Sequence, residues 1–258
     1  NWETPQTVTV TGVDDNNSDG HEEYEIRLSA ADILTDNPEV TTLAGSGSPT
    51  FADGTGTSAK FNYPYGITTD GTNLYVADQF NHKIRKIVIS TGVVTTLAGS
   101  SSGSTDATGT SATFNEPRGI TTDGTNLYVA DTDNHKIRKI VISSGVVTTL
   151  AGSGNADFAE GTGTAAKFNT PRDITTDGTN LYVADQFNHK IRKIVISTGV
   201  VTTLAGSSSG STDATGTSAK FNDPWGIATD GMNLYVADKD THKIRKIVIS
   251  TGVVTTLA

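Results

Sequence analysis

The 258-residue sequence contains no cysteine. It therefore has no disulfide framework and no thiolate that could ligate a metal or carry out redox chemistry. It has no apolar run near the roughly 18 residues that a membrane-spanning helix needs, and no signal peptide is recognisable. Lys and Glu are scarce, whereas Gly, Ser, Thr, Asp and Asn are abundant, which favours short strands and turns over helices.

Basic residues are also few, because 19 Lys and Arg stand against 28 Asp and Glu, for a net charge of -9. A general phosphate-binding surface is basic, so this balance makes nucleic-acid binding an unlikely function. The sequence begins with Asn1 rather than Met. We expect it to be a processed or excised piece of a longer protein.

What the sequence does contain is a repeat. Leu-Tyr-Val-Ala-Asp ends at Asp78, Asp131, Asp185 and Asp238, and three residues separate each copy from a following His-Lys-Ile-Arg-Lys. Self-similarity at a fixed period indicates a repeat architecture, in which each copy is one structural unit. Alternate copies are most alike: Gln-Phe-Asn-His occurs from Gln79 and Gln186, and a thirteen-residue loop sequence occurs from Ser100 and Ser207. This pairing suggests a duplicated unit of two repeats.

In the first repeat, a glycine-rich loop (46–64) precedes four predicted strands at 66–70, 74–78, 82–90 and 93–99. The first two predicted strands flank Asp70-Gly71, and Asp-Gly between apolar runs is a strong hairpin signal. Four short strands in a meander cannot bury both of their faces alone. Stacking such sheets radially, as the blades of a β-propeller, buries both faces.

The repeat resembles the NHL repeat of β-propellers over residues 39–258. The resemblance is carried by Phe61-Asn-x-Pro-x-Gly-Ile67, Leu74-Tyr-Val-Ala-Asp78, Asn81-His-Lys-Ile-Arg85 and Val94-Thr-Thr-Leu-Ala-Gly99. It implies an all-β propeller with four full blades, at 46–99, 100–152, 153–206 and 207–258. Thr241, Met232 and Asp173 are small departures from the pattern.

Val-Thr-Thr-Leu-Ala occurs five times, and its first copy, within 39–45, has no blade of its own. We predict that it is a spare outer strand. Three arrangements are open: the four blades close alone, residues 1–45 form a degenerate fifth blade, or another chain or further sequence completes the ring. Unpaired strand edges favour pairing with another chain.

Residues 1–38 lie outside the repeat. Alternating apolar residues at 7–11 and 24–28 predict two strands around an acidic loop. Residues 5–30 resemble the end of a Calx-β module. That resemblance implies calcium bound by loop carboxylates, since calcium prefers several oxygen ligands; a solvated acidic turn is the alternative. The candidate ligands are Asp14, Asp15, Asp19 and Glu22.

An Asp, a His and an Arg recur in every repeat at the junction of the second and third predicted strands. Such a pair of carboxylate and imidazole could perform acid–base chemistry. A catalytic site, however, needs different residues that converge on one place. We therefore predict a structural motif, in which the carboxylate pairs with His or Arg of its own blade. Its members are Asp78, His82, Arg85, Asp131, His135, Arg138, Asp185, His189, Arg192, Asp238, His242 and Arg245.

Lys83, Arg85 and Lys86 recur in the same way and predict a basic annulus, the one feature that favours RNA binding. Neighbouring acidic residues and few aromatic residues argue against it. The resemblance also admits lyases and lactonases with a metal in the central channel. We consider such an enzyme a minor alternative, because threonines occupy the expected channel positions 68 and 69.

The positions that differ between otherwise near-identical repeats are the candidate binding residues. Tyr, Arg and Trp are the residues most enriched in binding hot spots. One set of these positions follows the Pro at the start of the first strand, and its members should lie together near the axis. Aromatic residues in the second turn add to the proposed partner surface. The alternative is that these residues merely plug the blade tops. The candidates are Tyr65, Arg118, Arg172, Trp225, Phe80 and Phe187, and positions 63, 116, 170 and 223 vary as well.

These observations predict a non-enzymatic structural or adhesive module of a bacterial surface or secreted protein, which binds a protein partner or copies of itself. A recognition propeller for a protein or a glycan is the first alternative, and the metal-dependent enzyme is the second. We expect no cofactor apart from the calcium implied for the acidic loop.

Overall fold

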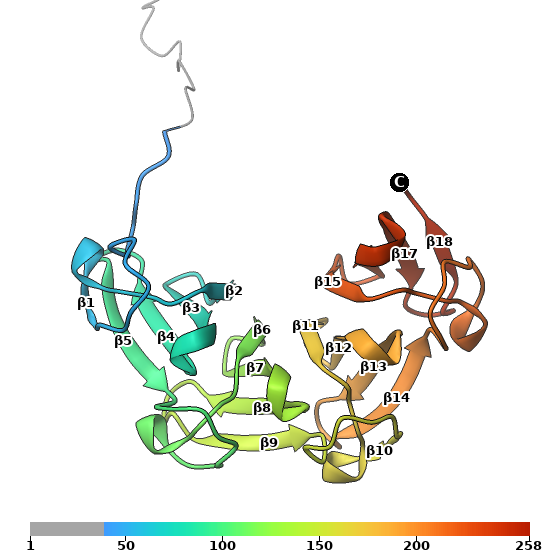
Figure 1. Cartoon of the computed structure of the whole chain (residues 1–258), viewed down its shortest axis with the longest axis horizontal. Coiled ribbons are helices and arrows are strands. Elements are labelled where there is room, and N and C mark those ends of the chain that lie inside the picture. Colours follow the sequence, from blue (N-terminus) through green and yellow to red (C-terminus); the bar gives the residue numbers. More distant parts are fainter. Residues whose placement is uncertain (1–38) are drawn as a thin grey trace, which may run out of the picture. The chain divides into compact units, whose positions relative to one another are not determined.

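A computed structural model describes residues 39–258 of the chain. The hairpin, the Calx-β resemblance and the calcium ligands Asp14, Asp15, Asp19 and Glu22 lie outside these residues. Residues 41–258 form one compact unit that contains four antiparallel sheets, as the propeller prediction requires (Figure 1). Each sheet is one blade.

Blade 1 is a meander of four strands in the order in which they follow along the chain. Its strands are β2 (Pro64–Thr69), β3 (Asn73–Asp78), β4 (Lys83–Val88) and β5 (Val93–Ala98). A short strand in the preceding loop, β1 (Gly54–Thr55), pairs with β5 at the outer edge, which the sequence did not predict. The four strands predicted for this repeat are therefore confirmed to within about two residues at each end.

The other three blades repeat this order, and the third also has the extra outer strand. Blade 2 contains β6 (Pro117–Thr122), β7 (Asn126–Asp131), β8 (Lys136–Val141) and β9 (Val147–Ala151). Blade 3 contains β10 (Gly161–Thr162), β11 (Pro171–Thr176), β12 (Asn180–Asp185), β13 (Lys190–Val195) and β14 (Val200–Ala205). Blade 4 contains β15 (Pro224–Thr229), β16 (Asn233–Asp238), β17 (Lys243–Val248) and β18 (Val254–Thr256).

The Asp-Gly turn between β2 and β3 is held by its own aspartate. Asp70 Oδ1 accepts hydrogen bonds from the backbone N–H groups of Thr72 (2.9 Å) and Asn73 (2.7 Å). Its Oδ2 accepts the hydroxyl hydrogen of Tyr75 at 2.8 Å. These donors hold the pKa of Asp70 well below its usual range although burial opposes the shift. Gly71 follows with φ +87°, a backbone conformation that favours glycine.

A fully buried arginine joins each blade to the loop that precedes it. In blade 1, the Arg85 side chain is 0% exposed and donates to Asp78 and Asp53, both at 2.7 Å. It also donates to the carbonyls of Lys60 (2.9 Å) and Ala52 (2.8 Å). Because a buried charge is costly unless it is paired and hydrogen-bonded, this network fixes the loop against the blade.

Neighbouring blades share a hydrophobic core. One core unites Tyr75, Ala77 and Ile84 of blade 1 with Phe114 and Leu127 of blade 2. Equivalent residues form the cores between blades 2 and 3 and between blades 3 and 4. Every blade therefore has two apolar faces: a leading face toward the preceding blade and a trailing face toward the following one.

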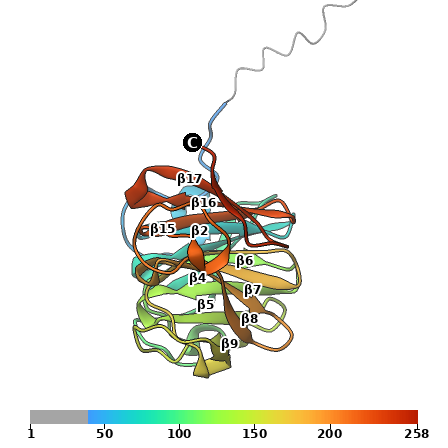
Figure 2. The ribbon, with the colours of Figure 1, turned by 90° about the vertical axis from the view of Figure 1, so that its right-hand side faces the viewer.

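The four blades form an arc in which blades 1 and 4 are apart (Figure 1). A view from the side shows the C-terminus next to β17 of blade 4 (Figure 2). Side-chain exposure agrees with the open arc. Ile67, on the leading face of blade 1, is 60% exposed, whereas its equivalents Ile120, Ile174 and Ile227 are 5%, 3% and 7% exposed. Ile244, on the trailing face of blade 4, is 43% exposed, whereas its equivalents in the other blades are fully buried. Within residues 41–258, the blades thus leave the ring open.

The segment 39–45, predicted as a spare outer strand, is not a strand in this structure. It nevertheless follows the path of an outer strand from a preceding blade. Gly45 N donates to Gly56 O at 3.1 Å, as Gly99 N donates to Gly109 O at 3.1 Å where β5 enters the loop of blade 2. It lacks a neighbouring strand to pair with, because no third strand of a preceding blade lies beside it among the described residues.

The buried ion pairs yield a prediction for stability. Asp131→Ala in blade 2 should lower the free energy of unfolding by about 3–5 kcal/mol, because Arg138 then stays buried without its 2.7 Å partner. Urea denaturation monitored by circular dichroism measures this change.

Asp106→Ala is the matched control, since Asp106 pairs with the same Arg138 at 2.6 Å but is 45% exposed. Water can replace its carboxylate, so the expected loss is about 1 kcal/mol or less. Equal losses for the two variants would contradict the role assigned to the buried pair.

Candidate functional site

Four variable residues, Tyr65, Arg118, Arg172 and Trp225, occupy the second position of the inner strands β2, β6, β11 and β15. We call them the hub cluster. Arg172 Nε donates to the Tyr65 hydroxyl at 3.0 Å, although the two residues are 107 positions apart. The Arg172 guanidinium carbon lies 3.2 Å from the centroid of the Trp225 ring and 5.2 Å from that of Tyr65. The structure thus brings Tyr65, Arg172 and Trp225 into contact, whereas Arg118 pairs with Glu116.

The aromatic rings hold the Arg172 guanidinium in place. Stacking on aromatic faces is a strong preference of arginine, and the attraction grows as the group loses water. Burial lowers the pKa of Arg172 from its ordinary value, but the group stays charged at neutral pH. A second cation, Lys239, lies with Nζ 4.8 Å from the Trp225 centroid.

Acidic groups surround the hub cluster as well. Arg118 donates to Glu116 Oε2 at 2.8 Å. Burial, reinforced by the Glu116 carboxylate, raises the pKa of Asp133, while Arg118, His135 and Arg172 oppose the shift. The hub cluster itself consists of aromatic rings and guanidinium groups, the residue types most enriched in protein-binding hot spots, and Glu116 and Asp133 lie beside it.

Asp173, where the other blades have glycine, has a structural role that the sequence did not reveal. Its Oδ2 accepts from Ile227 N of blade 4 at 2.9 Å, and its Oδ1 accepts from Ile174 N at 2.9 Å. Burial raises the pKa of this carboxyl group. Asp173 thereby links β11 to β15 directly behind Arg172 and Trp225, and so positions the hub cluster.

The two phenylalanines predicted for the partner surface are exposed, 41% for Phe80 and 51% for Phe187. Phe80 packs on Tyr63, with 4.8 Å between ring centroids, at the open leading side of blade 1. Phe187 has no aromatic neighbour among the described residues. Among the described residues, neither phenylalanine makes an aromatic or cation–π contact with the hub cluster.

The recurring Asp–His–Arg motif is divided between two tasks. Asp78 pairs with Arg85 as expected, and it also accepts from Asn81 and from Asn62 N. The Asp78–Arg85 ion pair recurs as Asp131–Arg138, Asp185–Arg192 and Asp238–Arg245, at 2.7 to 2.9 Å.

The histidine of the motif is not paired with this aspartate, contrary to one form of the prediction. Its Nδ1 instead accepts from a backbone N–H of the next blade. The distances are 3.2 Å for His82 and Glu116 N, 3.0 Å for His135 and Thr170 N, and 3.4 Å for His189 and Asp223 N. His242 lies in the last blade, has no following blade in this chain, and is exposed.

The predicted basic annulus is wrong in one respect. Arg85, Arg138, Arg192 and Arg245 are fully buried, so one of every three of its charges lies inside the protein. Among residues 39–258, no three His, Cys, Asp or Glu side chains come close enough together to hold a metal ion. Over the same residues, no helix is long and apolar enough to cross a membrane.

Comparison with known sequences agrees with the fold. Residues 114–140 match the family model described as NHL repeat. The chain is 43% identical over 104 residues to human NHL repeat-containing protein 2, which covers 38% of this chain and 14% of that protein. It is 30% identical over 238 residues to the Arabidopsis thaliana protein SUPPRESSOR OF QUENCHING 1, chloroplastic, which covers 84% of this chain and 22% of that protein. The chain thus spans a minor part of these relatives.

Comparison with solved structures supports the same architecture. An auxiliary nutrient binding protein from Bacteroides thetaiotaomicron superimposes with a TM-score of 0.59 at 20% identity, over 78% of this chain and 49% of that chain. At this identity the likeness concerns the fold. The chain contains an NHL repeat and is built from the four-stranded blades of a β-propeller.

The histidines between blades predict a pH dependence of stability. Burial lowers the pKa of both His82 and His135 below the ordinary 6.5, and Asp133 opposes the shift in both. For His82, Glu116 also opposes the shift and Lys83 adds to it. The unfolded chain therefore takes up these protons first. The free energy of unfolding should be highest above about pH 6.5 and should fall as the pH decreases from there toward the lowered pKa values.

Urea denaturation between about pH 5 and pH 8 tests this dependence. The control is the double variant His82→Asn, His135→Asn, whose amide oxygens can still accept the backbone N–H. Carboxylates titrate in both proteins, so the difference between the two pH profiles isolates the histidines. Parallel profiles would contradict the assignment.

Proposed function

We propose that this chain is a non-enzymatic interaction module, which binds a protein partner through the hub cluster. The stacked arrangement of Arg172 between Tyr65 and Trp225 is the observation that carries the proposal. Three blades contribute these residues from positions where the repeats differ. Residues that served only to plug the blades could be the same in every repeat, as the core residues are.

The chemistry of the hub cluster favours a partner that presents carboxylates. Both Arg172 and Lys239 lie over the Trp225 ring, so the ring already has two cationic partners and is less suited to stacking on a sugar. The Nη atoms of Arg172 can donate to a carboxylate in a bidentate manner. We therefore favour an acidic peptide segment over a glycan.

An enzymatic function has less support. The Asp and Arg of the recurring motif are buried and engaged in structural hydrogen bonds in every blade. A general acid or base must instead reach the proton that it transfers. The lyase and lactonase alternatives would need a reactive group elsewhere in the molecule.

A bacterial surface or secreted setting belongs to the same proposal. It rests on the Calx-β resemblance of residues 5–30, and calcium at the acidic loop rests on it too. The adhesive role would follow if the hub cluster binds a protein outside the cell.

Selection of random peptides displayed on phage tests the hub cluster. We expect the chain to enrich peptides with Asp or Glu next to an apolar residue. The double variant Arg172→Ala, Trp225→Ala should bind these peptides at least about 30-fold more weakly, since truncation of a hot-spot residue costs about 2 kcal/mol or more. Fluorescence anisotropy with labelled peptides measures the affinities.

The matched control is Met232→Ala, which removes a side chain that is 73% exposed in a hairpin turn of blade 4, outside the hub cluster. Its affinity for the peptides should be unchanged. Peptides that bind the chain and the hub-cluster variant equally well, with both proteins folded by circular dichroism, would overturn the proposal.

A further inference from the structure

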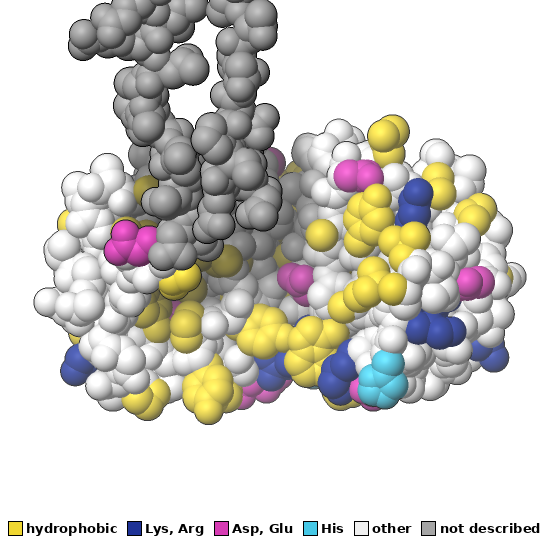
Figure 3. Space-filling view, turned by 90° about the horizontal axis from the view of Figure 1, so that it is seen from above, with side chains coloured by type: hydrophobic (Ala, Val, Ile, Leu, Met, Phe, Trp, Pro, Cys, Tyr) yellow, Lys and Arg dark blue, Asp and Glu magenta, His cyan; other side chains and the backbone are white. Residues whose placement is uncertain are grey.

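The two ends of the arc expose surfaces that are buried everywhere else in the protein. Blade 1 lacks a neighbour on its leading face, and a hollow of about 410 Å³ there is lined by Phe61, Ile67, Leu74 and Val76. Blade 4 lacks a neighbour on its trailing face, where hydrophobic side chains gather toward the opening of the arc (Figure 3). Each surface is the complement of the other, because three junctions within the chain join the same two faces.

The segment Val40–Ala44 shows how another chain would attach. Its sequence, Val-Thr-Thr-Leu-Ala, is identical to residues 254–258 and to the outer strands of the other blades. Val40 is 95% exposed, whereas the equivalent Val94, Val147, Val201 and Val254 are each 1% exposed. The segment therefore has the sequence of an outer strand but no blade beside it to pair with.

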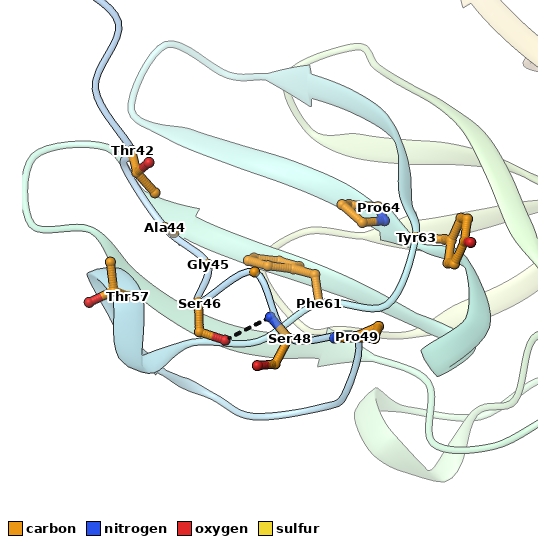
Figure 4. Close-up of a pocket in the computed structure, with 11 residues that line it drawn as sticks. Thr42, Ala44, Gly45, Ser46, Ser48, Pro49, Thr57, Phe61, Tyr63 and Pro64 are labelled. Carbon is orange, nitrogen blue, oxygen red and sulfur yellow. Dashed lines mark hydrogen bonds between the residues drawn. The ribbon is translucent and has the colours of Figure 1, made fainter.

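The segment is already anchored to blade 1 as an outer strand should be. A Cβ on Gly92 would lie 3.2 Å from the Leu43 carbonyl, just as one on Gly145 would lie 3.5 Å from the Leu97 carbonyl. Figure 4 shows Thr42, Ala44 and Gly45 along a stretch of chain that leads into the loop over Phe61. Only the pairing strand on the other side is missing.

The strand that Val40–Ala44 of another chain could join is β17, whose outer edge is occupied by residues 254–258 in this structure: Ile244 N donates to Ala258 O at 2.7 Å, and Leu257 N donates to Ile244 O at 2.8 Å. In this chain, β17 pairs with β18, which has three residues (Val254–Thr256), whereas the outer strands of the other blades have five or six. Leu257, at its end, is 54% exposed. Because residues 254–258 have the same sequence as Val40–Ala44, either segment can take this outer position on β17.

We propose that Val40–Ala44 of one copy of this chain pairs with β17 of a second copy, in place of residues 254–258. By the register of β18, Val40 would lie opposite Ile247, Thr41 opposite Lys246 and Thr42 opposite Arg245. The exchange lets the trailing face of blade 4 cover the leading face of blade 1 of the other copy. Addition of a strand to a sheet edge is a common mode of association.

The alternation of the repeats favours a second copy as the occupant. Blades 1 and 3 are alike, and so are blades 2 and 4. A junction from blade 4 to blade 1 of another copy therefore reproduces the junction from blade 2 to blade 3. There, the Thr132 hydroxyl donates to the Pro171 carbonyl at 2.9 Å; Lys239 and Pro64 hold the equivalent positions, and an ammonium group can make the same bond.

Two copies joined in this way at both ends form a closed ring of eight blades, within the range of about 4–8 blades that propellers have. Head-to-tail contacts either close or continue indefinitely. In a closed pair, both open faces are covered and Val40–Ala44 of each copy pairs with β17 of the other, while residues 254–258 are released from that edge.

Light scattering coupled to size exclusion tests the pair with the full chain. We expect twice the mass of one chain. Val40→Asp should raise the dissociation constant of the pair by about 100-fold or more, because the pair would bury its carboxylate: the equivalent valine of each blade is 1% exposed. Val40→Ile is the matched control and should remain paired. Since Val40 is almost fully exposed in one chain, neither change should alter the thermal unfolding of the single chain.

Cysteine cross-linking identifies the strands that meet, because the chain has no cysteine of its own. Thr41→Cys and Lys246→Cys, made in separate chains and then mixed, should yield a covalent dimer with a short bis-maleimide, since residues directly opposite in an antiparallel pair lie about 5 Å apart. Neither variant alone should cross-link efficiently.

Three results would overturn the proposal. The first is a monomer at every concentration tested. The second is a pair that Val40→Asp leaves intact. The third is a cross-link within one chain in the Thr41→Cys, Lys246→Cys double variant, which would show that the chain closes its own ring. A mass that keeps growing with concentration would overturn the closed pair as well.

Discussion

A blade with two apolar faces has to be covered on both sides, and the rest of this structure depends on that constraint. A single four-stranded sheet of this kind would leave Tyr75, Ile84 and Ile87 in water, but a neighbour on either side buries them. The near-identity of the repeats follows, because every junction joins the same trailing face to the same leading face. The constraint also explains which faces stay uncovered: among the isoleucines at equivalent positions of the four described blades, those that are exposed belong to the outward faces of blades 1 and 4.

Charge is used in this fold to fix loops rather than to build an active surface. The buried guanidinium of each blade satisfies carbonyls of a loop that has little apolar surface of its own. Blade 3 shows the limits of the arrangement: Glu160 replaces the loop aspartate, accepts from Thr203 N, and leaves Arg192 paired with Asp185 alone. The exposed ion pair is thus dispensable, whereas the buried pair occurs in all four blades.

Sequence reasoning predicted the elements that depend on local pattern. The Asp-Gly turns, the four strands of each blade and the closeness of Tyr65, Arg172 and Trp225 all follow from repeat spacing and strand periodicity. The contacts between blades were harder to predict. His82 accepts from the next blade because its backbone is left-handed (φ 54°), which a motif of residue types does not reveal. The buried arginines were missed as well, since alternation cannot separate buried from exposed positions when both faces are covered.

The segment 39–45 shows why sequence identity alone does not define a strand. Val40–Ala44 and residues 254–258 have the same five residues, yet only the latter segment includes a strand, because β17 lies beside it. Strand formation depends on the hydrogen-bonding partner, whereas the sequence sets only the suitability for pairing. The same reasoning separates the two kinds of position in this protein. Residues that are the same in all blades form the junctions, which any blade of this kind can complete. Residues that differ between blades, such as Arg172 and Trp225, make one face chemically distinct from the rest.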